Sequence, residues 1–215
     1  MKSLILKDLY NIGHNMKSLL ISFVIMAVAF IPTSNLVGLI VMCAVVCSMW
    51  ISTTFAFDDY SKWTRYAMIM PVSRKELVIG KFIVLAIFCA GGNLFGLVVS
   101  SIAALAMGNI TSGLTGMAEL LLGSTAALAI SLIIGGMSIP LMFKFGSEKA
   151  RMLLVVSMLI PVAIGFGTYR LFGLYFGELS EQLVIILICC SPVFALLWCY
   201  VMYQISYRIF SKKEL

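Results

Sequence analysis

Charged side chains are scarce in this chain. Of its 215 residues only 11% are charged, whereas 62% are hydrophobic. In a soluble domain roughly a quarter of the residues are charged. This chain therefore has too few charged residues to cover a globular surface in water. Proline and glycine, at 5 and 17 residues without a regular period, exclude collagen-like or disordered segments. The composition therefore predicts an all-α integral membrane protein and excludes a soluble enzyme.

Histidine occurs only once, and ionisable residues are absent from the middle of the long apolar segments. Proton- and sodium-coupled carriers usually need such groups near the bilayer midplane. Intramembrane metalloproteases need several histidine or carboxylate ligands, and ATP binding in a P-loop needs a G-x-x-x-x-G-K-[ST] motif that is missing here. We therefore expect no catalytic activity and no bound cofactor or metal. Energy for uphill transport would have to come from another polypeptide.

The six cysteines do not form the pattern of a disulfide framework or a metal site. All of them lie inside apolar segments, where cysteine behaves as a small hydrophobic residue. They are Cys43, Cys47, Cys89, Cys189, Cys190 and Cys199.

Six segments are long and apolar enough, or nearly so, to cross a bilayer as helices of about 20 residues. They cover about residues 18–35, 36–57, 77–107, 118–143, 151–176 and 183–208. The first is the weakest, because Pro32 ends its apolar run early. The turn that follows Pro32 predicts two antiparallel helices.

Basic residues are distributed unevenly between the two ends of these segments. Fourteen of the 15 fall on one side of the predicted membrane, and only Arg170 falls on the other. Cytoplasmic loops of membrane proteins carry an excess of lysine and arginine. The net charge of +6 therefore indicates cytoplasmic loops rather than nucleic-acid binding, and both termini are expected in the cytoplasm.

Residues 1–17 show the pattern of an amphipathic helix. Its apolar residues recur at i, i+4, i+7 and i+11, and they are Ile5, Leu9, Ile12 and Met16. Polar residues such as Lys7 and Asn11 fall on the opposite face. This pattern predicts a helix that lies in the cytoplasmic interface before the first span.

The longest loop on the basic side, residues 58–76, carries a second amphipathic pattern. Asp58 or Asp59 can cap a helix there. The predicted helix has an apolar face of Trp63, Tyr66, Ala67 and Met70, with Lys62 and Arg65 at its edges. Pro71 ends it, and the pair Ser73 and Glu76 forms a capping box for the third span. A helix that lies flat on the lipid surface would show the same pattern.

Two further patterns concern helix contacts. Residues 144–151 form a second loop on the basic side, in which Ser147 can cap the fifth span. We expect Lys144, Ser147 and Glu148 to form a second cytoplasmic contact on the same side as the first loop, although a plain connector explains the pattern equally well. In the third span, small residues recur every fourth position, at Gly92, Gly96, Ser100, Ala104 and Gly108. Such a stripe allows close helix contact. Packing within the chain and dimerisation explain it equally well.

Arg170 is the only basic residue on the predicted outer side, and it lies among aromatic residues such as Tyr169. Glu178 and Glu181 follow it. A structural ion pair with one of these carboxylates is favoured over contact with a substrate at this outer mouth.

The layout and the segment Met70-Pro71-Val72-Ser73-Arg74-Lys75-Glu76-Leu77 resemble the permease subunits of ABC-type exporters. The most similar group is that of small bacterial permeases that export amphipathic peptides, such as phenol-soluble modulins or lantibiotic-type bacteriocins. The resemblance covers the whole chain, as one permease domain of residues 1–215. It implies that residues 59–70 are a coupling helix that docks in a groove of a separate ATPase chain, and that residues after Pro161 form short re-entrant helices.

The same resemblance implies two permease chains, identical or paralogous, which work with two ATPase chains in a bacterial plasma membrane. ATP and Mg²⁺ would be bound by the ATPase, and the substrate would be an amphipathic peptide or a lipid-like molecule. The alternative is a self-sufficient channel or a lipid-binding membrane scaffold.

Overall fold

A computed structural model describes residues 2–13, 16–69, 73–107, 113–150 and 181–212, together with single positions between 153 and 170. All regular elements in these ranges are helices. In chain order they are α1 (Lys2–Gly13), α2 (Met16–Phe30), the 3-10 turn η1 (Ile31–Thr33), α3 (Leu36–Met49), α4 (Ile51–Tyr60), α5 (Trp63–Ile69), α6 (Arg74–Ala106), α7 (Gly113–Phe145) and α9 (Glu181–Ser211).

Four helices are long and apolar enough to cross a membrane. They cover Leu36–Tyr60, Arg74–Ala106, Gly116–Phe145 and Ile185–Ser211, and they coincide with four of the predicted segments. The predicted fifth span, residues 151–176, lies almost entirely outside the described residues. The chain is thus an all-α, multi-pass membrane protein.

The first predicted span is shorter than expected. α2 has 15 residues, which at about 1.5 Å per residue is roughly 22 Å, against a hydrocarbon core of about 30 Å. Pro32 lies in η1, directly after α2. α1 and α2 reach membrane-spanning length only as a pair that is bent by 65°, so the described residues contain four spans, or five with this broken pair.

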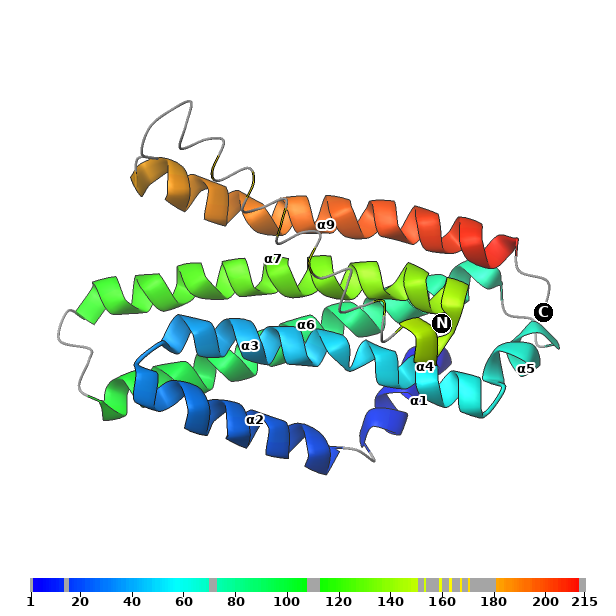
Figure 1. The fold of residues 1–215 in the computed structure, drawn as a ribbon, viewed down its shortest axis with the longest axis horizontal. Coiled ribbons are helices and arrows are strands. Elements are labelled where there is room, and N and C mark those ends of the chain that lie inside the picture. Colours follow the sequence, from blue (N-terminus) through cyan, green and yellow to red (C-terminus); the bar gives the residue numbers. More distant parts are fainter. Residues whose placement is uncertain are drawn as a thin grey trace.

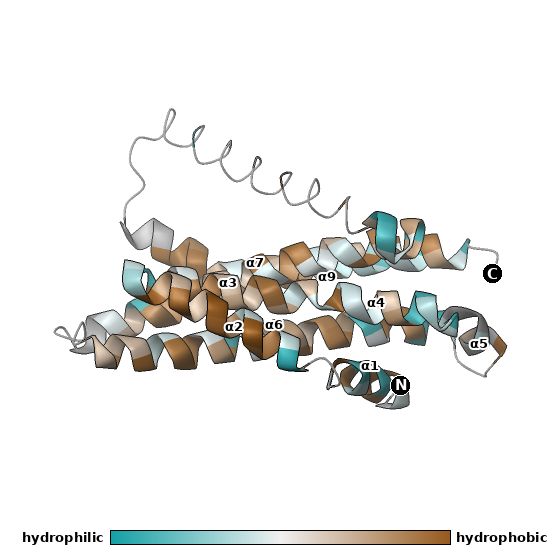
Figure 2. Ribbon diagram, turned by 60° about the horizontal axis from the view of Figure 1, so that its bottom comes forward, coloured by the Kyte–Doolittle hydropathy of each residue, from teal (hydrophilic) through white to brown (hydrophobic). Residues whose placement is uncertain are grey.

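The long helices lie side by side along the long axis of the molecule (Figure 1). α7 occupies the centre and packs against α3, α6 and α9, whereas α2 packs mainly against α3. α1, α5 and the end of α9 lie together at one end of the bundle, and the turn between α2 and α3 lies at the other (Figure 1). Hydrophilic segments gather near α1, the end of α4 and α5 (Figure 2). We call this the basic end, because it carries Lys7, Lys62, Arg74, Lys81, Lys144 and Arg208.

Three residues of the small-residue stripe, Gly92, Gly96 and Ser100, lie against α3 of the same chain, whereas Gly108 lies outside the described residues. A Cβ atom on Gly92 would come within 2.6 Å of Cys47 Cβ, and one on Gly96 within 3.0 Å of Ile40 Cα. The Ser100 hydroxyl donates a hydrogen bond of 3.0 Å to the carbonyl of Leu36. The stripe therefore serves packing within the chain, one of the two alternatives that the sequence leaves open.

The start of α6 has the predicted capping box. The Ser73 side chain accepts a hydrogen bond from the Glu76 N–H at 3.2 Å, and the Glu76 carboxylate accepts one from the Ser73 N–H at 3.1 Å. This double cap satisfies two N–H groups that a helix start leaves without partners. It separates α6 from the loop before it, as the sequence indicates.

Candidate functional site

The loop helix α5 is joined to α4 by a sharp turn at the basic end. α4 continues to Tyr60, and Lys62 then adopts a left-handed backbone conformation with φ of 50°. This conformation is uncommon for a residue other than glycine, and it turns the chain out of the span. α5 then has only 7 residues, Trp63–Ile69, so it is shorter than the predicted helix of residues 59–70.

The predicted cap of this loop helix is wrong. Asp58 is engaged in ion pairs with two lysines, and Asp59 accepts a hydrogen bond from a different part of the chain. Both aspartates belong to the last turn of α4, because that helix extends three residues beyond the predicted span. The aspartates thus tie α4 to its neighbours instead of starting α5.

The faces of α5 also differ from the predicted ones. Ala67 is completely buried and Trp63 is half-buried, four residues apart, so this side of α5 packs on the protein. Tyr66 is 60% exposed and Ile69 is 83% exposed. The predicted aromatic face is therefore divided, with Trp63 turned inward and Tyr66 turned outward.

Four charged side chains form a closed ring beneath α5. Lys81 Nζ in α6 lies 2.9 Å from the Asp8 carboxylate of α1 and 2.6 Å from the Asp58 carboxylate of α4. Lys7 Nζ in α1 contacts the other oxygen of Asp58 and lies 3.2 Å from Asp8. Each lysine thus contacts both aspartates. We call these four residues the charge ring.

The charge ring is buried. The side chains of Asp8, Asp58 and Lys81 are 5 to 9% exposed, and that of Lys7 is 24% exposed. The ammonium group of Lys81 has a third acceptor in the Thr54 hydroxyl at 3.1 Å, so its three N–H donors match three acceptors. Removal of one member of a buried ion pair leaves an uncompensated charge, which costs about 3–5 kcal/mol. The ring therefore fixes α1, α4 and α6 relative to one another.

Sequence reasoning missed this ring, although a signal was present. Asp8 lies three residues after Ile5 and four before Ile12, which places it on the apolar side of α1. Asp58 directly follows one apolar segment and Lys81 lies one turn inside the next, at ends that share one side of the membrane. Ionisable groups in such places pair with one another, so the three positions together predict an ion-pair cluster.

Trp63 connects α5 to the charge ring. Lys7 Nζ lies 4.6 Å from the centre of the Trp63 ring, within the range of a cation–π contact. The indole N–H is buried and has no hydrogen-bond partner within the described part of the chain. Displacement of α5 would therefore act directly on Lys7 in α1, as well as on α4 through the chain.

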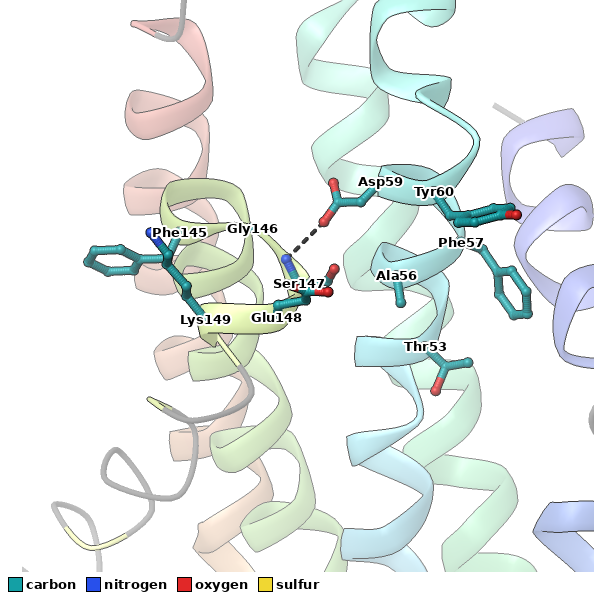
Figure 3. A pocket seen from close by; sticks show the side chains of 10 residues that line it. All are labelled: Thr53, Ala56, Phe57, Asp59, Tyr60, Phe145, Gly146, Ser147, Glu148 and Lys149. Carbon is teal, nitrogen blue, oxygen red and sulfur yellow. Dashed lines mark hydrogen bonds between the residues drawn. The ribbon is translucent and has the colours of Figure 1, made fainter.

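The two predicted cytoplasmic loops meet in the structure. The Asp59 carboxylate accepts a hydrogen bond of 2.8 Å from the backbone N–H of Ser147, across 88 positions of the chain (Figure 3). Gly146 has a φ of 79°, and residues 147–150 are helical. Asp59 thus caps this helical turn from outside, as a carboxylate at a helix start does. A side-chain cap by Ser147 itself is not needed.

A cavity of about 800 Å³ surrounds this hydrogen bond. Its walls come from the last two turns of α4 and from residues 145–149. In Figure 3 Asp59 points toward the turn at Ser147, whereas Phe57 and Tyr60 point away from that turn.

The same end is tied to the last helix. Arg74, at the start of α6, donates hydrogen bonds to the carbonyls of Phe210 and Ser211 at the end of α9. Those carbonyls lack partners within their own helix. Phe210 also packs on Phe143 with a ring distance of 5.0 Å. The helix that follows α5 in the chain, α6, is therefore anchored at its first turn.

The other predicted site residues either are exposed in the structure or lie outside the described residues. Lys144 and Glu148 are exposed beside the buried Ser147, and Lys62 is exposed at the turn before α5. Arg170 is an exposed helical residue that has an interaction partner. Met70, Tyr169, Glu178 and the side chain of Arg65 lie outside the described residues.

These observations define a multi-pass helical membrane protein whose basic end is held together by a buried charge ring and a helix cap between loops. The chain belongs to the ABC-2 family of transporters, because the family model described as ABC-2 family transporter protein matches residues 3–211. It is thus a membrane component of a transporter and is not catalytic itself. No curated protein matches the chain.

Proposed function

We propose that this chain is the membrane-spanning subunit of an exporter that a separate ABC-type ATPase drives. Permeases of this family generally work with such an ATPase. In this proposal two permease chains, identical or paralogous, pair with two ATPase chains that bind ATP and Mg²⁺. The basic end faces the cytoplasm of a bacterial cell, in agreement with the excess of lysine and arginine there.

The position of α5 carries this proposal. It lies at the tip of the basic end (Figure 1), with Tyr66 and Ile69 exposed on its outer side. Exposed aromatic anchors are typical of the residues that dominate protein interfaces. We therefore assign the ATPase contact to this outer side, flanked by Lys62, and not to the inward Trp63.

The inner side of α5 supplies the means to transmit a movement. Trp63 contacts Lys7, and Lys7 contacts Asp58 in the charge ring. Asp59 joins the end of α4 to the turn after α7. A movement of α5 upon ATP binding would therefore shift α1, α4, α6 and the 145–150 turn together, and the spans would alternate between inward-open and outward-open arrangements.

The substrate that we propose is an amphipathic or hydrophobic molecule, with antimicrobial or cytolytic peptides as the main class. The middle of each described span lacks ionisable residues, so no ion-coupled path for a hydrophilic solute is indicated. The resemblance to peptide-exporting permeases supports the same class.

One observation favours a second function. Tyr60 is 92% exposed and Tyr66 is 60% exposed at the same end of the molecule, and tyrosines are enriched at membrane–water interfaces. In a self-sufficient channel or lipid-binding scaffold, α5 would lie flat on the lipid surface instead of contacting an ATPase.

Co-purification of an ATPase chain from the native cell tests the proposal. With interface anchors worth about 2 kcal/mol or more, Tyr66→Ala should weaken ATPase binding roughly 30-fold, since 1.4 kcal/mol is tenfold. Trp63→Ala should have a smaller effect on binding, and Tyr200→Ala, which changes an exposed tyrosine of α9, should have none. If Tyr66→Ala retains the ATPase and full ATP turnover, the coupling role of α5 is wrong.

A further inference from the structure

A second cavity lies at the end of the bundle opposite α5. It has a volume of about 580 Å³, which is within the usual range of small-molecule sites of about 300–1,000 Å³. Its walls come from the beginnings of α3 and α7 and from the end of α6, which meet at this end (Figure 1). Most of the wall is apolar, with Leu36, Val37, Ala104, Leu105, Met117 and Leu120.

The polar groups of the wall are mostly occupied. The Asn35 side chain accepts a hydrogen bond from the Gly38 N–H at 2.9 Å and so caps α3. The Ser101 hydroxyl donates to the carbonyl of Leu97 at 2.7 Å. Neither group is free to recognise a charged ligand strongly.

Glu119 is different. It is the one charged residue in the cavity wall, and it makes no hydrogen bond or ion pair with any residue that the structure describes. It lies in α7, within the helix that spans Gly116–Phe145. Its side chain is exposed at the rim of the apolar walls, so a cationic group bound in the cavity would lie beside a carboxylate of opposite charge.

We propose that this cavity binds a cationic amphipathic peptide, with a lysine or N-terminal ammonium group at Glu119 and apolar side chains against Leu105 and Met117. This inference rests on the proposed export function and adds the charge of the substrate and a site for it. The complementary charge is the determining feature, because the apolar walls alone would accept neutral and anionic amphiphiles equally. The volume suits a few side chains, so the peptide would bind through one end.

The chain offers three informative substitutions and a matched control. Glu119→Gln removes the charge at nearly constant shape, and Glu119→Asp keeps it. A Cβ atom on Gly116, which also lines the cavity, would meet no atom within 4 Å. Gly116→Phe therefore introduces a large side chain at the cavity wall from a position where its Cβ atom has room. Glu148→Gln, which neutralises an exposed carboxylate at the basic end, is the matched control.

The experiment uses the full chain in phosphatidylcholine nanodiscs, with an environment-sensitive dye on a cysteine introduced at Ser34 in the cavity wall. The probe is a synthetic amphipathic helical peptide with lysines on its polar face, and the comparison peptide carries glutamates instead. The amount of peptide that adsorbs to empty nanodiscs is measured separately and subtracted from the total peptide concentration. An exposed ion pair is worth up to about 1 kcal/mol, so Glu119→Gln should weaken binding of the lysine peptide up to about fivefold.

Glu119→Asp and Glu148→Gln should bind the lysine peptide as the unmodified chain does, and Gly116→Phe should abolish the dye response. Equal binding by Glu119→Gln and the unmodified chain, or equal binding of the two peptides, would show nonspecific adsorption and overturn the proposal. A failure of the ATPase to co-purify with the unmodified chain would contradict the proposed function alone, because the peptide titration needs no ATPase.

Discussion

The carboxylate of Asp59 accepts a hydrogen bond from the backbone N–H of Ser147 and thereby joins two loops that are 88 positions apart. One loop leads into α5, and the other follows the central helix α7. In the proposed coupling role, a movement of α5 would reach the bundle through this bond as well as through the charge ring.

Loss of this cap should loosen the turn after α7. Asp59→Ala removes an N-cap acceptor, which usually costs about 1 kcal/mol, and backbone amide exchange at Ser147 should become several-fold faster. Hydrogen–deuterium exchange in detergent measures this. Ser147→Ala is the control, because the donor is the backbone N–H. Equal acceleration in Ser147→Ala would contradict the cap.

The charge ring should behave as a coupled unit. Lys81→Met leaves two aspartates facing one lysine and should destabilise the protein by about 3–5 kcal/mol. Addition of Asp8→Asn restores neutrality, so the double variant should be more stable than the two single losses predict. Thermal unfolding in detergent is the readout, with the exposed Lys144→Met as a control. Strictly additive losses would show that the four charges do not act together.

Close contact between α3 and α6 should be sensitive to side-chain size at one glycine and insensitive at another. Gly96→Leu would meet the backbone of Ile40 and should cost about 1–3 kcal/mol through overpacking. A Cβ atom on Gly91, in the same helix, would meet nothing within 4 Å, so Gly91→Leu should cost little. Melting temperature and monodispersity in detergent compare the two variants. A Gly96→Leu protein as stable as Gly91→Leu would mean that α6 faces lipid there.

The orientation can be tested by labelling from outside intact cells. With native cysteines replaced, a cysteine at Thr33 should react with an impermeant maleimide, and one at Ser61 should not. Both positions are exposed in the structure, so only the side of the membrane distinguishes them. Reaction at Ser61 would reverse the assignment of the basic end to the cytoplasm.

The spans and the capping box could be predicted from the sequence because both follow from local patterns. Apolar runs alone define four of the helices, and the Ser73 and Glu76 pair lies only three residues apart. The end of α2 was harder to predict, because apolar residues continue past the point where Pro32 changes the backbone geometry.

The site was only partly predictable because its contacts are distant in sequence. Amphipathic periodicity places Trp63 and Tyr66 next to each other on α5, but the boundary between its buried and exposed sides falls between them. That boundary depends on how the turn at Lys62 directs α5 against residues distant in sequence. The pairing of Lys81 with Asp8 depends on how α1 folds back on α6, which no local pattern specifies.

Photo-crosslinking from position 66 tests most directly the claim that α5 contacts an ATPase. A photoreactive amino acid is placed at Tyr66, and at Tyr200 as the control, in the full chain expressed in its native cell. The outer side of α5 predicts a crosslink from position 66 to an ABC-type ATPase and none from position 200. Crosslinks from position 66 to lipid alone would contradict the claim.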